Sequence, residues 1–116
     1  FTKESRFAEN DHRSYNRDGA AFNVGETFAG LPFDKGVELA ERLRWIADGR
    51  GSMTRAALRW ILHFDAISCV IPGFKTVAQV EENVAALEAP GFSDEELARL
   101  SRFYHEEVKA HIRGPY

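Results

Sequence analysis

A short stretch in the second half of the chain combines residue types that bind phosphate. Residues 67–71 are apolar, and they are followed by Pro72, Gly73, a lone Lys75 and the start of a helical pattern at Thr76. In α/β proteins, ligands bind where a strand leads into a helix, because the helix N–H groups attract anions. Glycine allows a ligand to approach the backbone, and lysine adds a compact positive charge. The stretch therefore indicates a candidate phosphate site.

The predicted helix after this stretch carries polar side chains on one face. Gln79 and Glu82 are three residues apart, and Gln79 and Asn83 are four apart, so the three share a face. With Lys75, they would contact a phosphate and a polar ring together. A simpler interpretation stays open, in which Gly73 only makes a turn, the lysine is solvated, and the glutamine only completes a helix cap.

Hydrophobic periodicity predicts helices around a single strand. The run at 67–71 lacks alternation, which is typical of a parallel strand buried on both faces. Thr76-x-x-Gln79 and Ser93-x-x-Glu96 are capping boxes that begin two of the helices. The predicted helices cover residues 34–48, 52–64, 77–87 and 94–111, and residues 1–32 are predicted to form a long polar loop.

The predicted strand needs neighbours that this sequence does not supply. Backbone N–H and C=O groups of a buried strand require partners on both edges. We expect those partners to belong to another chain or to a part of the protein outside this sequence. The chain starts at Phe1 and not at Met, which fits the expectation that it begins within a longer protein.

Composition and charge exclude several classes of function. The formal net charge is -3, which gives no excess of basic residues for nucleic acid or an anionic membrane. No apolar run approaches the ~20 residues that span a bilayer. The single cysteine, Cys69, allows no internal disulfide, and no Cys/His set has metal-ligand spacing. We therefore expect a reduced, cytoplasmic setting without nucleic-acid, membrane or metal partners.

The sequence resembles the C-terminal region of aldo-keto reductases over nearly its whole length. The motifs that carry the resemblance are ALRWIL at 57–62, VIPG at 70–73, QVEENVAA at 79–86 and the loop pattern NDHRxxNRDG at 10–19 with GETF at 25–28. The resemblance implies an α/β fold in which residues 1–116 form the C-terminal part of a (β/α)8 TIM barrel, mostly helical with one strand. Residues 67–71 would be its last strand.

The resemblance also implies a cofactor site for the adenosine half of NADPH. Its members would be Gly73, Phe74, Lys75, Gln79, Glu82 and Asn83. The first three would hold the 2′-phosphate with the glutamine beside them, and the last two would bind adenine. Many family members have an arginine in place of Gln79 and a lysine–serine pair in place of Gly73-Phe74. One cation here replaces two, which weakens a strict preference for NADPH over NADH.

None of the family's catalytic tetrad of Asp, Tyr, Lys and His maps onto this sequence. The resemblance therefore implies a part of an oxidoreductase that reduces aldehydes or ketones with NADPH, and we expect the 116 residues alone to be inactive. The carbonyl substrate would be a small molecule, and the rest of the barrel would come from the same chain or another. The alternative is a stand-alone helical module for binding or oligomerisation, without catalysis.

Overall fold

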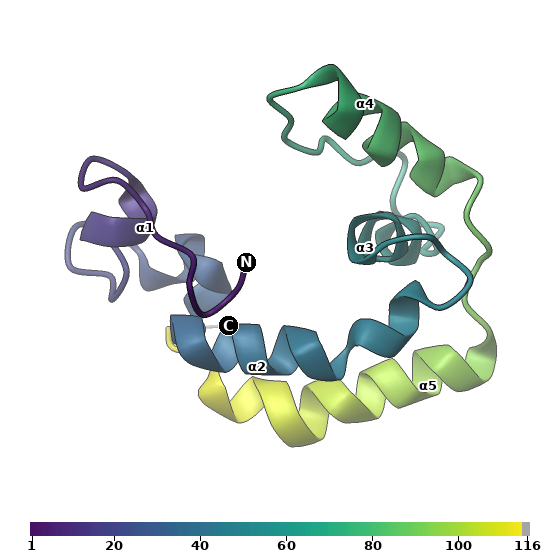
Figure 1. Cartoon of the computed structure of the whole chain (residues 1–116). Helices are drawn as coiled ribbons and strands as arrows, with labels where there is room; N and C mark the ends of the chain where they lie inside the picture. Colours follow the sequence, from purple (N-terminus) through teal and green to yellow (C-terminus); the bar gives the residue numbers. More distant parts are fainter. Residues whose placement is uncertain (115–116) are drawn as a thin grey trace. The chain divides into compact units, whose positions relative to one another are not determined.

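The computed structural model describes residues 1–114, which form helices, turns and loops (Figure 1). By its internal contacts the chain divides into two units. One consists of Phe1–Arg42 together with the chain from Arg99 onward, and the other is Leu43–Ala98. Across the described residues, every helix is too short or too polar to cross a membrane.

The unit Leu43–Ala98 contains the candidate phosphate site and is built on two helices that pack together. Ala56 on the first helix and Ala86 after the second are both buried, and their small side chains allow close approach. In chain order its elements are the 3-10 turn Arg44–Ala47, α3 (Met53–Ile61), α4 (Val77–Val84), the 3-10 turn Ala85–Leu87 and the beginning of α5 (Asp94–Phe103).

The strand predicted at residues 67–71 is not formed in the described part of the chain. These residues have no ladder partner, and the cartoon shows no arrow (Figure 1). Cys69 is exposed, and Ile71 is 93% exposed. The backbone groups of a strand need hydrogen-bond partners on a neighbouring strand, and residues 1–114 supply none. The expectation of a strand buried on both faces is therefore wrong for this structure.

Several helices end earlier than their hydrophobic periodicity predicts. The helix expected over 34–48 is split into α2 (Phe33–Arg42) and the 3-10 turn that follows it, with Leu43 between them. The helix expected over 52–64 ends at Ile61. α5 ends at Phe103 and continues as a π-helical turn, Tyr104–Val108, and a 3-10 turn, Lys109–His111. An apolar stripe marks which residues face a core, but not where the helical hydrogen bonds change type.

The other unit packs around phenylalanine rings. Phe1, Phe7, Phe28 and Phe33 form a cluster with ring centroids 5.1 to 6.3 Å apart. The guanidinium of Arg13 lies 4.5 Å from the centroid of the Phe7 ring, a cation–π distance. Residues 1–32 were expected to form a polar loop, but three of their phenylalanine rings meet the buried ring of Phe33, and Phe1 stays 71% exposed.

Short turns and one buried side chain organise the rest of residues 1–32. They form α1 (His12–Tyr15) and the turns Val24–Glu26 and Phe28–Gly30. Asn16 is fully buried; its Oδ1 accepts hydrogen bonds from the N–H groups of Ala21 and Phe22, and its Nδ2 donates to Thr27 Oγ1. One amide therefore replaces the regular hydrogen bonds that a helix or strand would provide.

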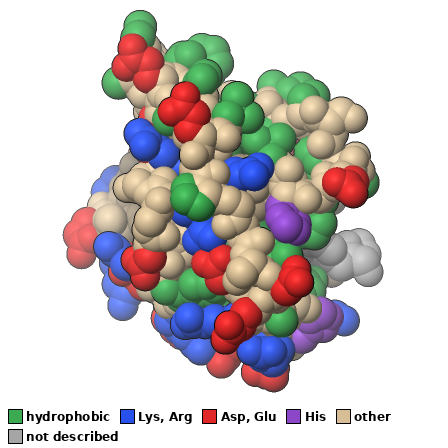
Figure 2. Space-filling model, turned by 90° about the vertical axis from the view of Figure 1, so that its right-hand side faces the viewer, with side chains coloured by type: hydrophobic (Ala, Val, Ile, Leu, Met, Phe, Trp, Pro, Cys, Tyr) green, Lys and Arg blue, Asp and Glu red, His purple; other side chains and the backbone are tan. Residues whose placement is uncertain are grey.

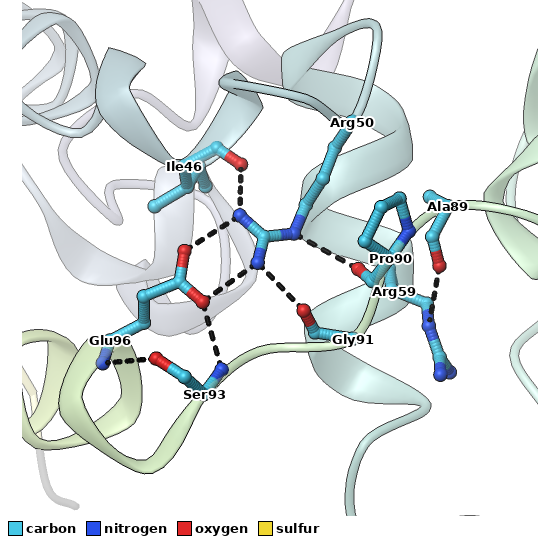
Figure 3. A network of polar contacts seen from close by, with 8 residues as sticks. All are labelled: Ile46, Arg50, Arg59, Ala89, Pro90, Gly91, Ser93 and Glu96. Atoms are coloured by element: carbon cyan, nitrogen blue, oxygen red, sulfur yellow. Dashed lines mark hydrogen bonds and ion pairs between the residues drawn. The ribbon is translucent and has the colours of Figure 1, made fainter.

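Arg50 connects three segments of the unit Leu43–Ala98 (Figure 3). Its guanidinium donates to the carbonyl oxygens of Ile46, Pro90 and Gly91 at 3.1, 3.0 and 2.7 Å. It also donates to both carboxylate oxygens of Glu96, at 2.9 and 2.8 Å. Because the side chain is only 5% exposed, its charge requires these partners.

Glu96, which pairs with Arg50, also caps the start of α5. Glu96 Oε2 accepts the Ser93 N–H at 2.8 Å, and the Glu96 N–H donates to Ser93 Oγ at 3.2 Å, which confirms the predicted capping box. The hydrogen bonds from Arg50, followed by the Ser93 N–H, hold the pKa of Glu96 below its ordinary value of 4.5. The position of α5's first turn is thus coupled to the loop before α3.

Replacing Arg50 with alanine should destabilise the chain far more than the same change at Arg59. The first change leaves Glu96 and three carbonyl oxygens without the hydrogen bonds from Arg50. We expect the free energy of unfolding to fall by about 3 kcal/mol, the lower end for breaking a buried pair. Within residues 1–114, the side chain of Arg59 makes one hydrogen bond, from Nε to Ala89 O at 3.0 Å, so its loss should cost about 1 kcal/mol. Urea unfolding measures both, and equal losses would contradict the central role of Arg50.

Candidate functional site

The loop before α4 is fixed by a reciprocal cap. Gln79 Oε1 accepts the N–H groups of Lys75 and Thr76 at 2.6 and 3.3 Å, and the Gln79 N–H donates to Thr76 Oγ1 at 3.2 Å. The capping box predicted here is confirmed. Gln79 therefore does what the simpler interpretation requires of it, and it also sets the direction in which the loop enters the helix.

Asn83 closes the other side of this loop. Its Nδ2 donates to the carbonyl oxygen of Gly73 at 3.4 Å, which ties the beginning of the loop to the last turn of α4. A Cβ atom placed on Gly73 would meet no atom within 4 Å. The structure therefore brings Gly73, Gln79 and Asn83 together and leaves open space beside the glycine backbone.

Lys75 and Phe74 project from this loop into solvent. Phe74 is 62% exposed, and Lys75 is also exposed. Among the described residues, no carboxylate lies within ion-pair distance of the Lys75 ammonium group. The lysine lies just before α4, where helix geometry leaves the N–H groups of Val77 and Ala78 without partners in the helix. An unpaired cation beside such N–H groups favours an anion.

Glu82 lies on α4 but is held by α3. Its carboxylate accepts hydrogen bonds from Ser52 Oγ and from Arg55, whose Nε and terminal nitrogen lie 3.0 and 2.7 Å from Oε2. These hydrogen bonds, first from Ser52 and then from Arg55, lower the pKa of Glu82 from its ordinary value of 4.5. The bonds join the first turn of α3 to α4, so Glu82 has a structural role in addition to any contact with a ligand.

Sequence reasoning missed Ser52 and Arg55 as neighbours of the candidate site. Ser52 lies at the start of the helix predicted over 52–64, and it caps α3 by accepting the Arg55 N–H at 3.2 Å. Nothing in the spacing connects either residue with Glu82, which is 27 residues beyond Arg55. The only signal in the sequence is that Ser52 and Arg55 are polar side chains at a helix start, where hydrogen-bond donors favour a carboxylate.

The residues near this loop are suited to an anion and not to a metal ion. Within residues 1–114, no group of three or more His, Cys, Asp or Glu side chains is placed to hold a metal. The loop instead offers the Lys75 ammonium group, helix N–H groups and open space beside Gly73. Ammonium and N–H groups are donors that bind phosphate.

A comparison with models of protein families identifies the family of this chain. The model of the aldo/keto reductase family matches residues 1–105, so the chain belongs to the aldo/keto reductase family. The resemblance drawn from the sequence motifs is thereby confirmed. Membership in this family implies a TIM barrel, whereas the described residues form helices, turns and loops and no strand.

Two curated relatives are similar to half of the chain. They are the L-glyceraldehyde 3-phosphate reductases of Escherichia coli O157:H7 and Escherichia coli strain K12, each 41% identical over 61 residues. The aligned stretch is 52% of this chain and 18% of each relative, so the relatives are matched over well under two thirds of their length. No solved structure gives a significant match.

The contact between Glu82 and α3 predicts a pH-dependent stability difference. Because the folded state lowers the pKa of Glu82, this carboxylate contributes stability above about pH 4.5, which is lost as the pH falls through its folded pKa. Glu82→Gln should therefore be less stable than the wild type at pH 7, and the gap should narrow below pH 4.5. Urea midpoints measured from pH 7 to pH 3 test this.

The matched control is Glu81→Gln, on the exposed neighbouring position of the same helix. It removes the same charge from α4 without removing a bond to Ser52 or Arg55. The contact of Glu82 with α3 would be contradicted if the stability difference between the wild type and Glu82→Gln stayed constant with pH. A difference equal to that of Glu81→Gln would also contradict it.

Proposed function

We propose that the loop at residues 73–76 and the helix α4 bind the adenosine 2′-phosphate half of NADPH in a carbonyl reductase. The observation that carries the proposal is the exposed Lys75 ammonium group just before α4, which has no ion-pair partner among the described residues. Family membership supports it, because the matched family consists of aldo/keto reductases. The cofactor supplies a hydride, which an aldehyde or ketone accepts.

In this proposal the 2′-phosphate is recognised by charge and by backbone donors. Lys75 pairs with the dianion, and the N–H groups that open α4 add their partial positive charge. The open space beside Gly73 lets the nucleotide approach the backbone, and Phe74 lies exposed next to it. Gln79 acts mainly by holding the loop in place, since its Oε1 is bound to the Lys75 and Thr76 N–H groups.

The adenine would be bound by Glu82 and Asn83. Glu82 already accepts bonds from Ser52 and Arg55, but a carboxylate has about four lone-pair positions and has room for a further donor. Asn83 uses one of its two amide hydrogens on Gly73 and retains its oxygen as an acceptor. The side chain of Glu82 is therefore prepositioned by α3, and that of Asn83 by the loop.

The cofactor site does not include catalytic residues of this chain. We propose that hydride transfer takes place on residues of the rest of the barrel, and that these 116 residues alone reduce no substrate. The relatives from Escherichia coli reduce a phosphorylated aldehyde by name. We extend to this chain only the broader class, a small-molecule aldehyde or ketone.

The test is Lys75→Ala in the complete reductase, with the dissociation constants of NADPH and NADH measured by fluorescence titration. Loss of a charged hydrogen bond to the 2′-phosphate should weaken NADPH binding about 10- to 100-fold. NADH lacks that phosphate, so its binding should hardly change.

Two matched variants sharpen the result. Lys75→Arg keeps the charge and should retain most of the NADPH affinity. Lys109→Ala removes an exposed lysine from the other unit and should change neither constant. Equal weakening of NADPH and NADH by Lys75→Ala would refute the 2′-phosphate role.

A second candidate function is supported by the exposed apolar side chains of the unit Leu43–Ala98. Hydrophobic side chains reach the surface among charged ones (Figure 2). A groove of about 310 Å³ between α3, residues 68–72 and α4 is lined mainly by apolar side chains, including Leu58, Leu62, Val70 and Leu87. Such surface favours association, either with the rest of a barrel or with a second copy as a stand-alone module.

Association through this surface predicts a concentration-dependent mass. The purified chain should elute above its monomer mass of 13.1 kDa, and Ile71→Lys should shift it toward the monomer because it places a charge at the exposed apolar run. Light scattering after size exclusion measures both. A folded oligomer that ignores NADPH would favour the stand-alone module, whereas a monomer at all concentrations would contradict association.

A further inference from the structure

Arg113 is bound to two segments that lie more than eighty residues earlier in the chain. Its N–H and its Nε both donate to the carbonyl oxygen of Gly30, at 3.0 and 3.2 Å. Its terminal nitrogens donate to Asp18 Oδ1 at 2.9 Å and to the carbonyl oxygen of Arg17 at 3.2 Å. All of these residues belong to one unit.

The segment that Arg113 contacts needs outside support. Phe28, Ala29 and Gly30 follow one another with φ of 53°, 52° and 73°, and the first two are not glycines. Residues with side chains rarely adopt this left-handed conformation, and they keep it only where surrounding contacts impose it. The bonds from Arg113 to the Gly30 carbonyl hold the end of this strained turn.

The contact between Gly30 and Arg113 requires a glycine at position 30. A Cβ atom there would lie 2.5 Å from the carbonyl oxygen of Arg113, closer than real Cβ atoms approach a backbone. The positive φ disfavours a side chain independently. Glycine is therefore required both by the conformation of the turn and by the approach of the residues around Arg113.

We propose that Ile112–Gly114 is a latch that keeps residues 17–30 in their folded form. The arginine fork makes this possible, because one planar guanidinium reaches a carboxylate and two backbone carbonyls at once. The proposal is independent of any cofactor. When the latch is released, residues 17–30 open while the unit Leu43–Ala98 keeps its structure. The contacts of residues 112–114 thus control whether residues 17–30 are open.

Limited trypsin digestion tests the latch, because the Arg17 carbonyl that Arg113 holds belongs to a trypsin-sensitive bond. Arg113→Ala should speed cleavage between Arg17 and Asp18 about five-fold, the change in open population expected for about one net hydrogen bond. Arg113→Lys keeps the charge but loses the fork, so its rate should lie between those of the wild type and the alanine variant. Mass spectrometry identifies the fragments.

Two glycine variants form a matched pair for the same digestion. Gly30→Ala should speed cleavage at Arg17 as Arg113→Ala does, because the added methyl group displaces the latch. Gly36→Ala, inside α2, meets only Leu31 Cβ at 3.9 Å and should leave the rate unchanged.

Hydrogen exchange separates local opening from general unfolding. In Arg113→Ala, the Ala21 and Phe22 amides bound by Asn16 should exchange faster, whereas the amides of α3 should keep their wild-type rates. Unchanged cleavage in both Arg113→Ala and Gly30→Ala would overturn the proposal. An equal rise of exchange in α3 would also overturn it, because the arginine would then stabilise the whole chain and not the loop.

Discussion

The buried charge of Arg50 is the constraint on which the arrangement around α4 depends. A guanidinium that is almost fully removed from water must satisfy its donors within the protein, and Arg50 does so with three carbonyls and Glu96. It also lies 3.9 Å from the centroid of the Phe92 ring. Lysine has neither the planar fork nor the number of donors to replace it.

Ion pairs and hydrogen bonds therefore fix α4 from more than one direction. Glu82 ties the helix to Ser52 and Arg55 at the start of α3. The chain that leaves α4 is held at Ala89 by Arg59 and at Pro90 by Arg50. These contacts fix the position of α4 and of Lys75 just before it, because α4 has no buried residue. The loop before α4 is thus held in place by polar bonds more than by a hydrophobic core.

Local chemistry was predictable from the sequence, and long-range pairing was not. The capping boxes at Thr76 and Ser93 follow from residues three apart, and the structure contains both. The clustering of Gly73, Gln79 and Asn83 follows from helical spacing and a short loop. Apart from Ile46, the partners of Arg50 lie 40 to 46 residues away, and those of Glu82 and Arg113 lie 27 to 96 residues away, so no local pattern encodes them.

The run at residues 67–71 shows where the sequence pattern and the structure differ. Its apolar character predicts a strand with neighbours on both edges, and in this structure the run forms no strand and Ile71 is exposed. The strand is not formed because hydrogen bonds between strands need a neighbouring strand, and the described residues contain none. The aromatic contacts of residues 1–32 could not be predicted, because the phenylalanines have no periodic spacing although their rings meet in space.

The central claim is that the start of α4 recognises a 2′-phosphate. The most direct measurement is an NMR titration of the chain with adenosine 2′,5′-bisphosphate and, in parallel, with adenosine 5′-monophosphate. The account predicts that amide shifts change at residues 73–83 with the bisphosphate, and much less with the monophosphate. Equal shifts with the two nucleotides, or none at Lys75 and its neighbours, would contradict it.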